Sequence, residues 1–183
     1  AVARKLLDFV SNVERGAVAM GVDIRGAQPS PGNMAGGITT IEEKSLGCVY
    51  KGGTSPIEDV LNYAGQATGK GLFIMDTPGQ DVESVSGMLA GGCTVVLFTT
   101  GRGTPTGSPI APVVKITGNP NTWVTMKENI DFDASPILTR GETLQRLGQT
   151  LQKLLLRTAS GRKTRSELLG HLEFAITRCG PTI

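Results

Sequence analysis

The 183-residue chain has few aromatic residues, few cysteines and almost no net charge. Because aromatic residues make up only 4%, the core must be built mainly from Val, Ile, Leu and Met. A net charge of +2 provides no large positive surface, so we expect no nucleic-acid partner. No apolar run is long enough to cross a membrane, so we expect no membrane partner either. The three cysteines are too few and too scattered for a disulfide framework, which predicts a reducing, cytoplasmic location: Cys48, Cys93 and Cys179.

Glycine and proline are abundant and occur in short clusters between apolar runs, a pattern typical of tight connections in α/β enzymes. Continuous apolar strands that alternate with helices indicate a parallel sheet covered on both faces. We therefore predict an α/β fold over residues 57–183, a three-layer Rossmann-like domain with a mostly parallel sheet covered by helices. The predicted strands are residues 71–75, 93–98 and 113–116, and the predicted helices include 81–90 and 142–158.

Residues 1–56 are predicted to form an N-terminal helical and motif-bearing loop segment. Its first 13 residues have the pattern of an amphipathic helix rather than of a signal peptide. A Thr followed three residues later by Glu predicts a capped helix that begins near Thr39 or Thr40 and ends near Gly47. Ser55 and Pro56 predict a further helix that runs to about residue 64. Because there is no initiator Met and the opening is already helical, we expect this segment to continue from a missing upstream domain.

Two polar loops follow predicted strands, at the positions where parallel sheets place their sites. The first begins with Asp76 and Thr77, and an Asp here could bind a metal or a hydroxyl, or cap the next helix. The second offers hydroxyls, backbone N–H groups and a guanidinium, which binds carboxylates through two parallel hydrogen bonds. An ordinary Gly-rich surface loop would have the same composition. The predicted substrate-binding residues of this loop are Thr99, Thr100, Gly101, Arg102 and Gly103.

A second group of candidates combines carboxylates with an amine, because Asn33 precedes Glu42, Glu43 and Lys44. Such groups suit metal ligation or proton transfer at a carbon beside a carboxylate. They equally suit a capped surface helix with solvated charges. His171 is the sole histidine, so any imidazole acid–base role within this chain falls to it, although lone histidines are more often structural. One His and scattered Cys do not make the usual zinc ligand set.

Four runs of residues occur in a distinctive order along the chain. They are Gly-Gly-Ile-Thr-Thr-Ile-Glu-Glu-Lys from Gly36, Met-Asp-Thr-Pro-Gly from Met75, Thr-Thr-Gly-Arg-Gly-Thr from Thr99 and Lys-Ile-Thr-Gly-Asn-Pro from Lys115. Together these runs resemble the altronate/galactarate dehydratase family, and the resemblance covers nearly the whole chain. The tail, with Ser166-Glu167, Gly170-His171 and Glu173-Phe174, is similar to that of the altronate branch.

The resemblance implies the C-terminal part of a cytoplasmic hydro-lyase that removes water from a sugar acid, an altronate-type aldonate or galactarate. It also implies a divalent metal, iron or manganese, the missing N-terminal domains as partners, and a homo-oligomer. Carried onto this sequence, it suggests roles in proton transfer, metal binding and carboxylate binding. The base would be Lys44 with Glu42 or Glu43, and the metal ligands would be Glu43 and Asp76. Arg102 would bind the substrate carboxylate, and Asn33 would also belong to the substrate site. His171 would be the acid.

Three alternatives to a dehydratase remain open from the sequence. A neighbouring branch of the same family cleaves sulfite from sulfolactate by a similar elimination. A phosphate- or nucleotide-binding module would suit Gly101-Arg102-Gly103, but no Gly-x-Gly-x-x-Gly or Walker motif is present, and the prolines that follow disfavour a helix N-terminus there. The chain could also be a structural, dimer-forming domain that is inert without the missing part.

Overall fold

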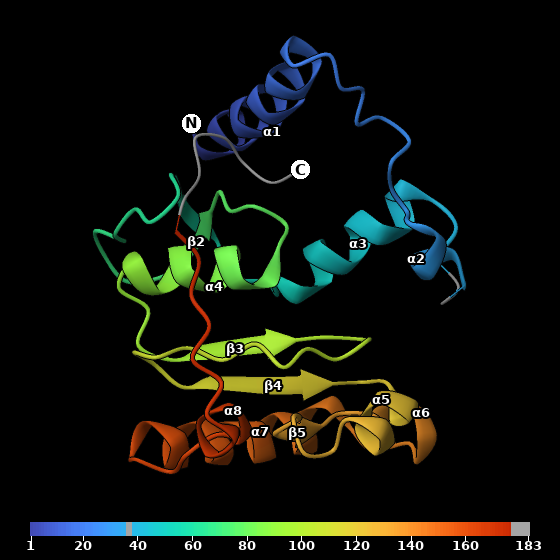
Figure 1. Cartoon of the computed structure of the whole chain (residues 1–183), viewed down its shortest axis with the longest axis vertical. Helices are drawn as coiled ribbons and strands as arrows, with labels where there is room; N and C mark the ends of the chain where they lie inside the picture. Colours follow the sequence, from blue (N-terminus) through green and yellow to red (C-terminus); the bar gives the residue numbers. More distant parts are fainter. Residues whose placement is uncertain (36–37, 177–183) are drawn as a thin grey trace. The chain divides into compact units, whose positions relative to one another are not determined.

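The computed structural model describes residues 1–35 and 38–176, which divide into two compact units (Figure 1). Of the described residues, the first unit contains Ala1–Asn62 and Ala67–Asp76, and the second contains Tyr63–Gln66 and residues 77–176. The domain boundary predicted between residues 56 and 57 stays a prediction. Three residues named in the sequence analysis lie outside the described residues: Gly36, Gly37 and Cys179.

The first unit packs one long helix against a pair of parallel strands. Helix α1 (Val2–Ala19) contacts strand β1 (Ile57–Leu61), which pairs with β2 (Leu72–Met75). Lys5 of α1 forms an ion pair with Asp59 of β1, with its Nζ 2.9 Å from both carboxylate oxygens. The hydrogen bond from Lys5 lowers the pKa of Asp59. The amphipathic helix predicted for residues 1–13 is confirmed, and it continues to Ala19.

The helix predicted from Ser55 to residue 64 is wrong, because this segment forms strand β1. Its backbone pairs in parallel with β2, with Val60 opposite Ile74. Val60 is β-branched and only 1% exposed, so it contributes to the core of this unit. The Ser-Pro pair is a local helix-start signal, and pairing with a strand distant in sequence outweighs it.

Two helices, α2 (Pro31–Ala35) and α3 (Ile41–Lys51), carry the N-terminal motif. The hydroxyl of Thr40 accepts a hydrogen bond from the Glu43 N–H at 3.2 Å, and the Glu43 carboxylate accepts one from the Thr40 N–H at 3.3 Å. This reciprocal pair confirms the predicted capping box. Helix α3 continues past Gly47, where the sequence predicted its end, since one glycine inside a helix costs only about 1 kcal/mol.

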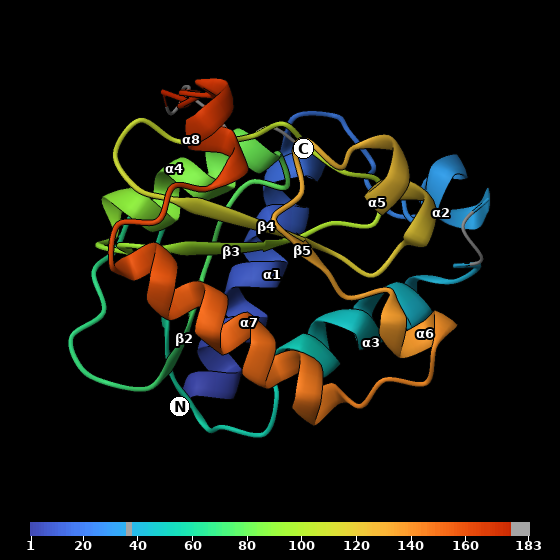
Figure 2. The ribbon, with the colours of Figure 1, turned by 90° about the horizontal axis from the view of Figure 1, so that it is seen from below.

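The second unit is a three-layer α/β arrangement around a parallel sheet with the strand order β3–β4–β5 (Figure 2). In the described ranges, no helix has both the length and the apolar character needed to cross a membrane. The elements of this unit are, in chain order, α4 (Asp81–Ala90), β3 (Val96–Thr99), β4 (Val113–Thr117), α5 (Pro120–Thr125), β5 (Phe132–Asp133), α6 (Pro136–Thr139), α7 (Leu144–Ala159) and α8 (Arg165–Leu169).

The central strand β4 is buried along its whole length, between two helices. On one face, Val113 packs with Val85 and Leu89 of α4. On the other face, Val114 and Ile116 pack with the leucine stripe of α7, made by Leu147, Leu151 and Leu154. The Rossmann-like α/β prediction is confirmed, and so are α4 and α7. The described strands pair in parallel throughout, and they form two sheets, one in each unit.

A substitution at Gly87 of α4 tests the packing of the second unit. A Cβ at this position would lie 2.2 Å from Cε2 of Tyr63, closer than packed carbons approach. We expect Gly87→Ala to lower the free energy of unfolding by about 1–3 kcal/mol, the usual cost of overpacking. Gly148 of α7 is the control, because a Cβ there meets nothing within 4 Å. Gly148→Ala should raise the free energy of unfolding by about 0.5–1 kcal/mol. Urea denaturation measures both changes, and an unchanged Gly87→Ala variant would contradict this packing.

Candidate functional site

Hydrogen bonds to backbone groups hold the start of the loop that follows β3. The carbonyl of Gly101 accepts from Thr122 Oγ1 at 2.6 Å and from Asn119 Nδ2 at 3.1 Å. Asn119 also caps α5, where its Oδ1 accepts from the Asn121 N–H. Within the loop, the Gly103 N–H donates to Thr100 Oγ1 at 2.9 Å. The start of the loop is therefore attached to α5, which follows the neighbouring strand β4.

Glycine is required at position 103 for two reasons. Its φ of +85° lies in the left-handed region, which side chains with a Cβ rarely adopt. A Cβ would also lie 2.1 Å from the sulfur of Met126. The Gly103 turn thus fits closely against α5 and the residue that follows it, and it sets the direction of the chain directly after Arg102.

Arg102 is exposed on this held loop, and its guanidinium forms no hydrogen bond or ion pair with any described residue. A guanidinium presents several N–H donors in one plane, which matches the two oxygens of a carboxylate. The preceding Thr99 ends β3 and is also exposed. The loop lies at the carboxyl end of a parallel strand, where α/β sheets place their sites. Its arrangement can bind an anionic group.

The far end of the same loop contacts His171, the predicted acid. The His171 Nδ1 lies 2.5 Å from the carbonyl oxygen of Pro105. Because a carbonyl oxygen can only accept, Nδ1 must carry the proton, which leaves Nε2 free to take up or release one. The structure therefore attaches two predicted site residues, Arg102 and His171, to one loop of the second unit.

In the first unit the structure brings together Asn33 and Lys44. The Lys44 ammonium donates to Asn33 Oδ1 at 3.1 Å and also to the side-chain oxygen of Gln28. The same Asn33 oxygen accepts from the Ser30 N–H at 3.1 Å and from the Ser30 hydroxyl at 2.9 Å. Lys44 is thus paired with neutral oxygens at the start of α2 rather than with a carboxylate.

The carboxylate of Glu43 caps the start of α3. Its Oε2 accepts from the Thr39 N–H at 2.7 Å and from the Thr39 hydroxyl at 2.9 Å, in addition to the Thr40 N–H. The Thr39 backbone bond first, and then the Thr39 hydroxyl and the Thr40 N–H, lower the pKa of Glu43. A carboxylate with a lowered pKa is a weak base near neutral pH. The geometry therefore suits a helix cap or a ligand better than a general base. The neighbouring Glu42 is exposed.

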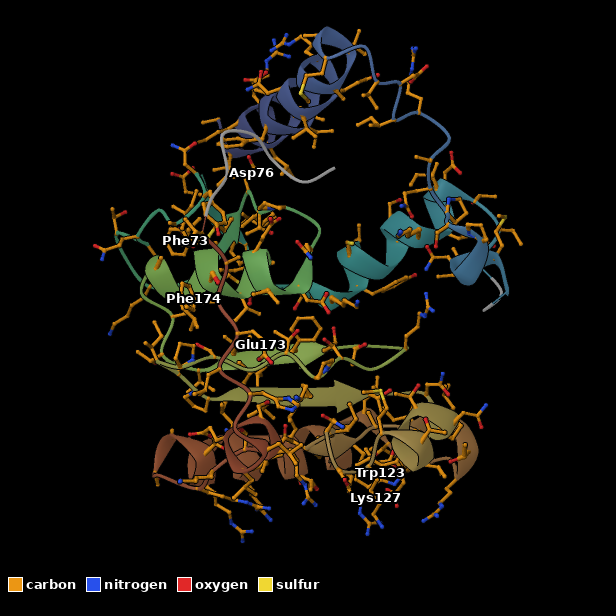
Figure 3. The ribbon with its side chains drawn as sticks, viewed as in Figure 1. Phe73, Asp76, Trp123, Lys127, Glu173 and Phe174 are labelled. Atoms are coloured by element: carbon orange, nitrogen blue, oxygen red, sulfur yellow. The ribbon has the colours of Figure 1, made fainter. Side chains whose placement is uncertain are left out.

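Asp76 and Thr77 are adjacent in sequence but belong to different units. Asp76 follows β2, and its N–H donates to the Leu61 carbonyl at 2.9 Å, which extends the pairing with β1 (Figure 3). The Thr77 hydroxyl lies 3.1 Å from that of Ser84. The candidate residues therefore fall into two sets. The first unit holds Asn33, Glu42, Glu43, Lys44 and Asp76, and the second holds Thr77, residues 99–103 and His171.

The comparisons with known proteins identify the family. The sequence matches the family described as D-galactarate/Altronate dehydratase, C-terminal, over residues 1–182. The chain belongs to this family. It is 38% identical to altronate dehydratase of Escherichia coli over 183 residues, 100% of this chain and 36% of that protein. It is 46% identical to (2R)-sulfolactate sulfo-lyase subunit beta of Chromohalobacter salexigens over 157 residues, 85% of this chain and 40% of that protein.

Galactarate dehydratase (L-threo-forming) of Escherichia coli is 39% identical over 167 residues, 88% of this chain and 31% of that protein. The chain thus spans between 31% and 40% of the length of these curated relatives. The family resemblance predicted from the sequence is confirmed, and the named relatives are lyases. Further domains or subunits complete these proteins, since one relative is itself named as a subunit.

The metal expected for a dehydratase of this family does not fit the described residues alone. Within residues 1–35 and 38–176, no three His, Cys, Asp or Glu side chains lie together in a way that could hold a metal ion. One carboxylate oxygen of Glu43, a predicted metal ligand, already accepts three hydrogen bonds at the start of α3. The ligand roles of Glu43 and Asp76 stay predictions.

Two residues that hold the loop after β3 occur in the family-like runs of the sequence, but neither of them was given a role from the sequence alone. Lys115 donates from inside the sheet to the carbonyls of Pro105 and Thr106. Glu173 accepts a hydrogen bond from the Gly107 N–H at 3.0 Å (Figure 3). A lysine in the middle of an otherwise apolar strand was a usable signal for the first. The role of Glu173 could not be predicted in the same way, because its partner Gly107 is 66 residues away in the sequence.

The pKa of Glu43 gives a pH-dependent test of the α3 cap. Because the folded pKa lies below the ordinary value of 4.5, the capping contribution is present above pH 4.5 and is lost as pH falls through the lower folded value. An NMR titration should show the Glu43 carboxyl and the Thr39 N–H changing together below pH 4.5. Glu43→Gln should abolish this transition, whereas Glu42→Gln should preserve it. Titration of Glu43 at or above 4.5 would contradict the cap.

Proposed function

We propose that this chain is the C-terminal part of a hydro-lyase that removes water from a sugar acid, an altronate-type aldonate or galactarate. Membership of the dehydratase family supports the reaction class. The proposed substrate class rests on the Arg102 guanidinium. This group is exposed, it is bonded to no described residue, and it lies on a loop that α5 holds in place. A carboxylate is the group that altronate and galactarate share, and it matches the guanidinium in charge and shape.

In the proposed elimination, residues of the second unit bind the substrate and supply a proton. Arg102 binds the substrate carboxylate, and a base of the complete protein removes the proton from the carbon beside that carboxylate. The electron pair of the broken C–H bond forms the double bond, and the C–O bond breaks. Protonated His171 then gives its Nε2 proton to the departing hydroxyl, which leaves as water. The base role expected for Lys44 with Glu42 or Glu43 stays a prediction.

A sulfo-lyase is the second candidate, and the relative named as a sulfolactate sulfo-lyase subunit supports it with 46% identity. Sulfolactate also carries a carboxylate, so Arg102 would bind the same group in either reaction. The two candidates differ in the leaving group, which is sulfite in one and water in the other. Assay of the complete protein with altronate, galactarate and sulfolactate, with detection of sulfite and of the keto-acid product, separates them.

Arg102→Ala tests the carboxylate-binding role in the complete enzyme. Loss of a charge-assisted hydrogen-bonded pair worth about 1.5–3 kcal/mol should lower kcat/KM by about 10- to 100-fold, mainly through a higher KM. Arg102→Lys should give an intermediate kcat/KM, because the positive charge remains but the planar pair of N–H donors is lost. Arg162→Ala is the control, since Arg162 is also exposed in the second unit. Steady-state kinetics measure each variant, and unchanged kinetics for Arg102→Ala would rule the role out.

A further inference from the structure

Lys115 lies in the middle of the central strand β4 and is fully buried, with 0% of its surface exposed. It is on the same face of the sheet as Val113, because alternate residues of a strand point to the same side. Burial of an ammonium group is costly unless hydrogen bonds replace its lost water. A buried lysine in this position therefore depends on the partners that the second unit offers it.

The partners of Lys115 are backbone carbonyls of the loop that carries Arg102. Its Nζ donates to the Pro105 oxygen at 3.0 Å and to the Thr106 oxygen at 3.3 Å. The contact therefore holds the loop backbone directly. Hydrogen bonds from an ammonium are stronger than those between neutral groups. Thr106 is buried, so water cannot readily take the place of this donor.

The same part of the loop holds the tail that follows α8. Pro105 contacts His171, and the Gly107 N–H donates to Glu173. Further along the tail, the Ala175 N–H donates to the Ser86 hydroxyl of α4 at 2.9 Å, so the tail crosses the unit from α8 to α4 (Figure 1). The tail and the loop are therefore held as one structure.

The charges around Lys115 are consistent with this arrangement. Burial lowers the pKa of Lys115, and the negative charges of Asp131 and Glu173 oppose that shift. Desolvation raises the pKa of Glu173, but the Gly107 N–H, its own N–H and the positive charges of His171 and Lys115 together bring it below its ordinary value. Asp131 also accepts a hydrogen bond from the Lys115 N–H at 2.8 Å. Two carboxylates thus face the buried ammonium without forming an ion pair with it.

Hydrogen bonds hold the loop on both sides of Arg102. Before it, the Gly101 carbonyl is bonded to side chains at α5, and after it, the Pro105 and Thr106 carbonyls are bonded to Lys115. We propose that Lys115 is a positioning residue of the carboxylate site, which fixes the loop so that Arg102 faces the substrate; His171 contacts the same Pro105 carbonyl that Lys115 holds. This inference rests on the proposed function. Lys115 is not a catalytic residue, because its fully buried ammonium cannot touch a substrate.

Lys115→Met removes the ammonium and keeps most of the side-chain volume in the core. In the complete protein, hydrogen exchange of peptides that cover residues 99–107 should become about tenfold faster, while peptides of α7 keep their rates. Lys127→Met is the matched control, because Lys127 is an exposed lysine two residues after α5 that forms no hydrogen bond with residues 99–107 (Figure 3). If Lys115→Met does not fold, Lys115→Gln, which keeps a neutral donor, replaces it with the same expected direction.

A double-mutant cycle separates positioning from a merely structural effect. Lys115→Met alone should lower kcat/KM by about tenfold, mainly through KM. In the Arg102→Ala background the same change should lower kcat/KM by less than about twofold, because no guanidinium remains to be positioned. An equal loss in both backgrounds would overturn the inference, because it would show that Lys115 does not act through Arg102.

The two measurements also distinguish this inference from the proposed function. Unchanged exchange of residues 99–107 in Lys115→Met overturns the positioning role and leaves carboxylate binding by Arg102 standing. Unchanged KM in Arg102→Ala overturns carboxylate binding itself. Faster exchange of the loop, together with non-additive kinetics, supports both.

Discussion

The loop after β3 runs partly through the interior of the second unit, so its backbone polar groups must find partners there. Lys115 supplies the donor for the Thr106 carbonyl, and Glu173 supplies the acceptor for the Gly107 N–H. The hydroxyl of Thr104 accepts from the Thr106 N–H at 3.3 Å. These partners come from the central strand, the tail and the loop itself. These bonds hold the loop in an arrangement that leaves Arg102 exposed.

An exposed arginine on a held loop is suited to binding an anion. Its guanidinium forms no bond with a described residue that a ligand would have to break. The loop is already ordered by Gly103 and Thr122, so binding does not have to order the backbone. The named reactions of the relatives differ in the group that leaves, but altronate, galactarate and sulfolactate all carry a carboxylate. A carboxylate site in the C-terminal part is compatible with each of them.

Elements with a strong internal pattern could be predicted from the sequence. The leucine stripe predicts α7, and the Thr40–Glu43 spacing predicts the cap of α3, because both depend on residues close in the chain. Strand β1 was predicted as a helix, since its local start signal is helical and its pairing partner lies more than ten residues away.

The candidate site could be predicted only in part, for the same reason. Arg102 was identifiable because polar residues directly follow an apolar strand. The contact between Lys44 and Asn33 and that between His171 and Pro105 join distant segments, so sequence spacing gives their candidates but not their partners. The burial of Lys115 follows from the position of β4 between α4 and α7, which requires the assembled unit.

Direct observation of the Arg102 guanidinium tests carboxylate binding most sharply. Isotope-labelled arginine in the complete protein gives an Nε–H NMR signal for Arg102, which the Arg102→Ala variant assigns by its loss. Carboxylate binding predicts that this signal shifts on titration with the sugar acid and stays in place with the matching alditol, which lacks the carboxylate. A signal that does not move at saturating sugar acid, or that moves equally with the alditol, would contradict it.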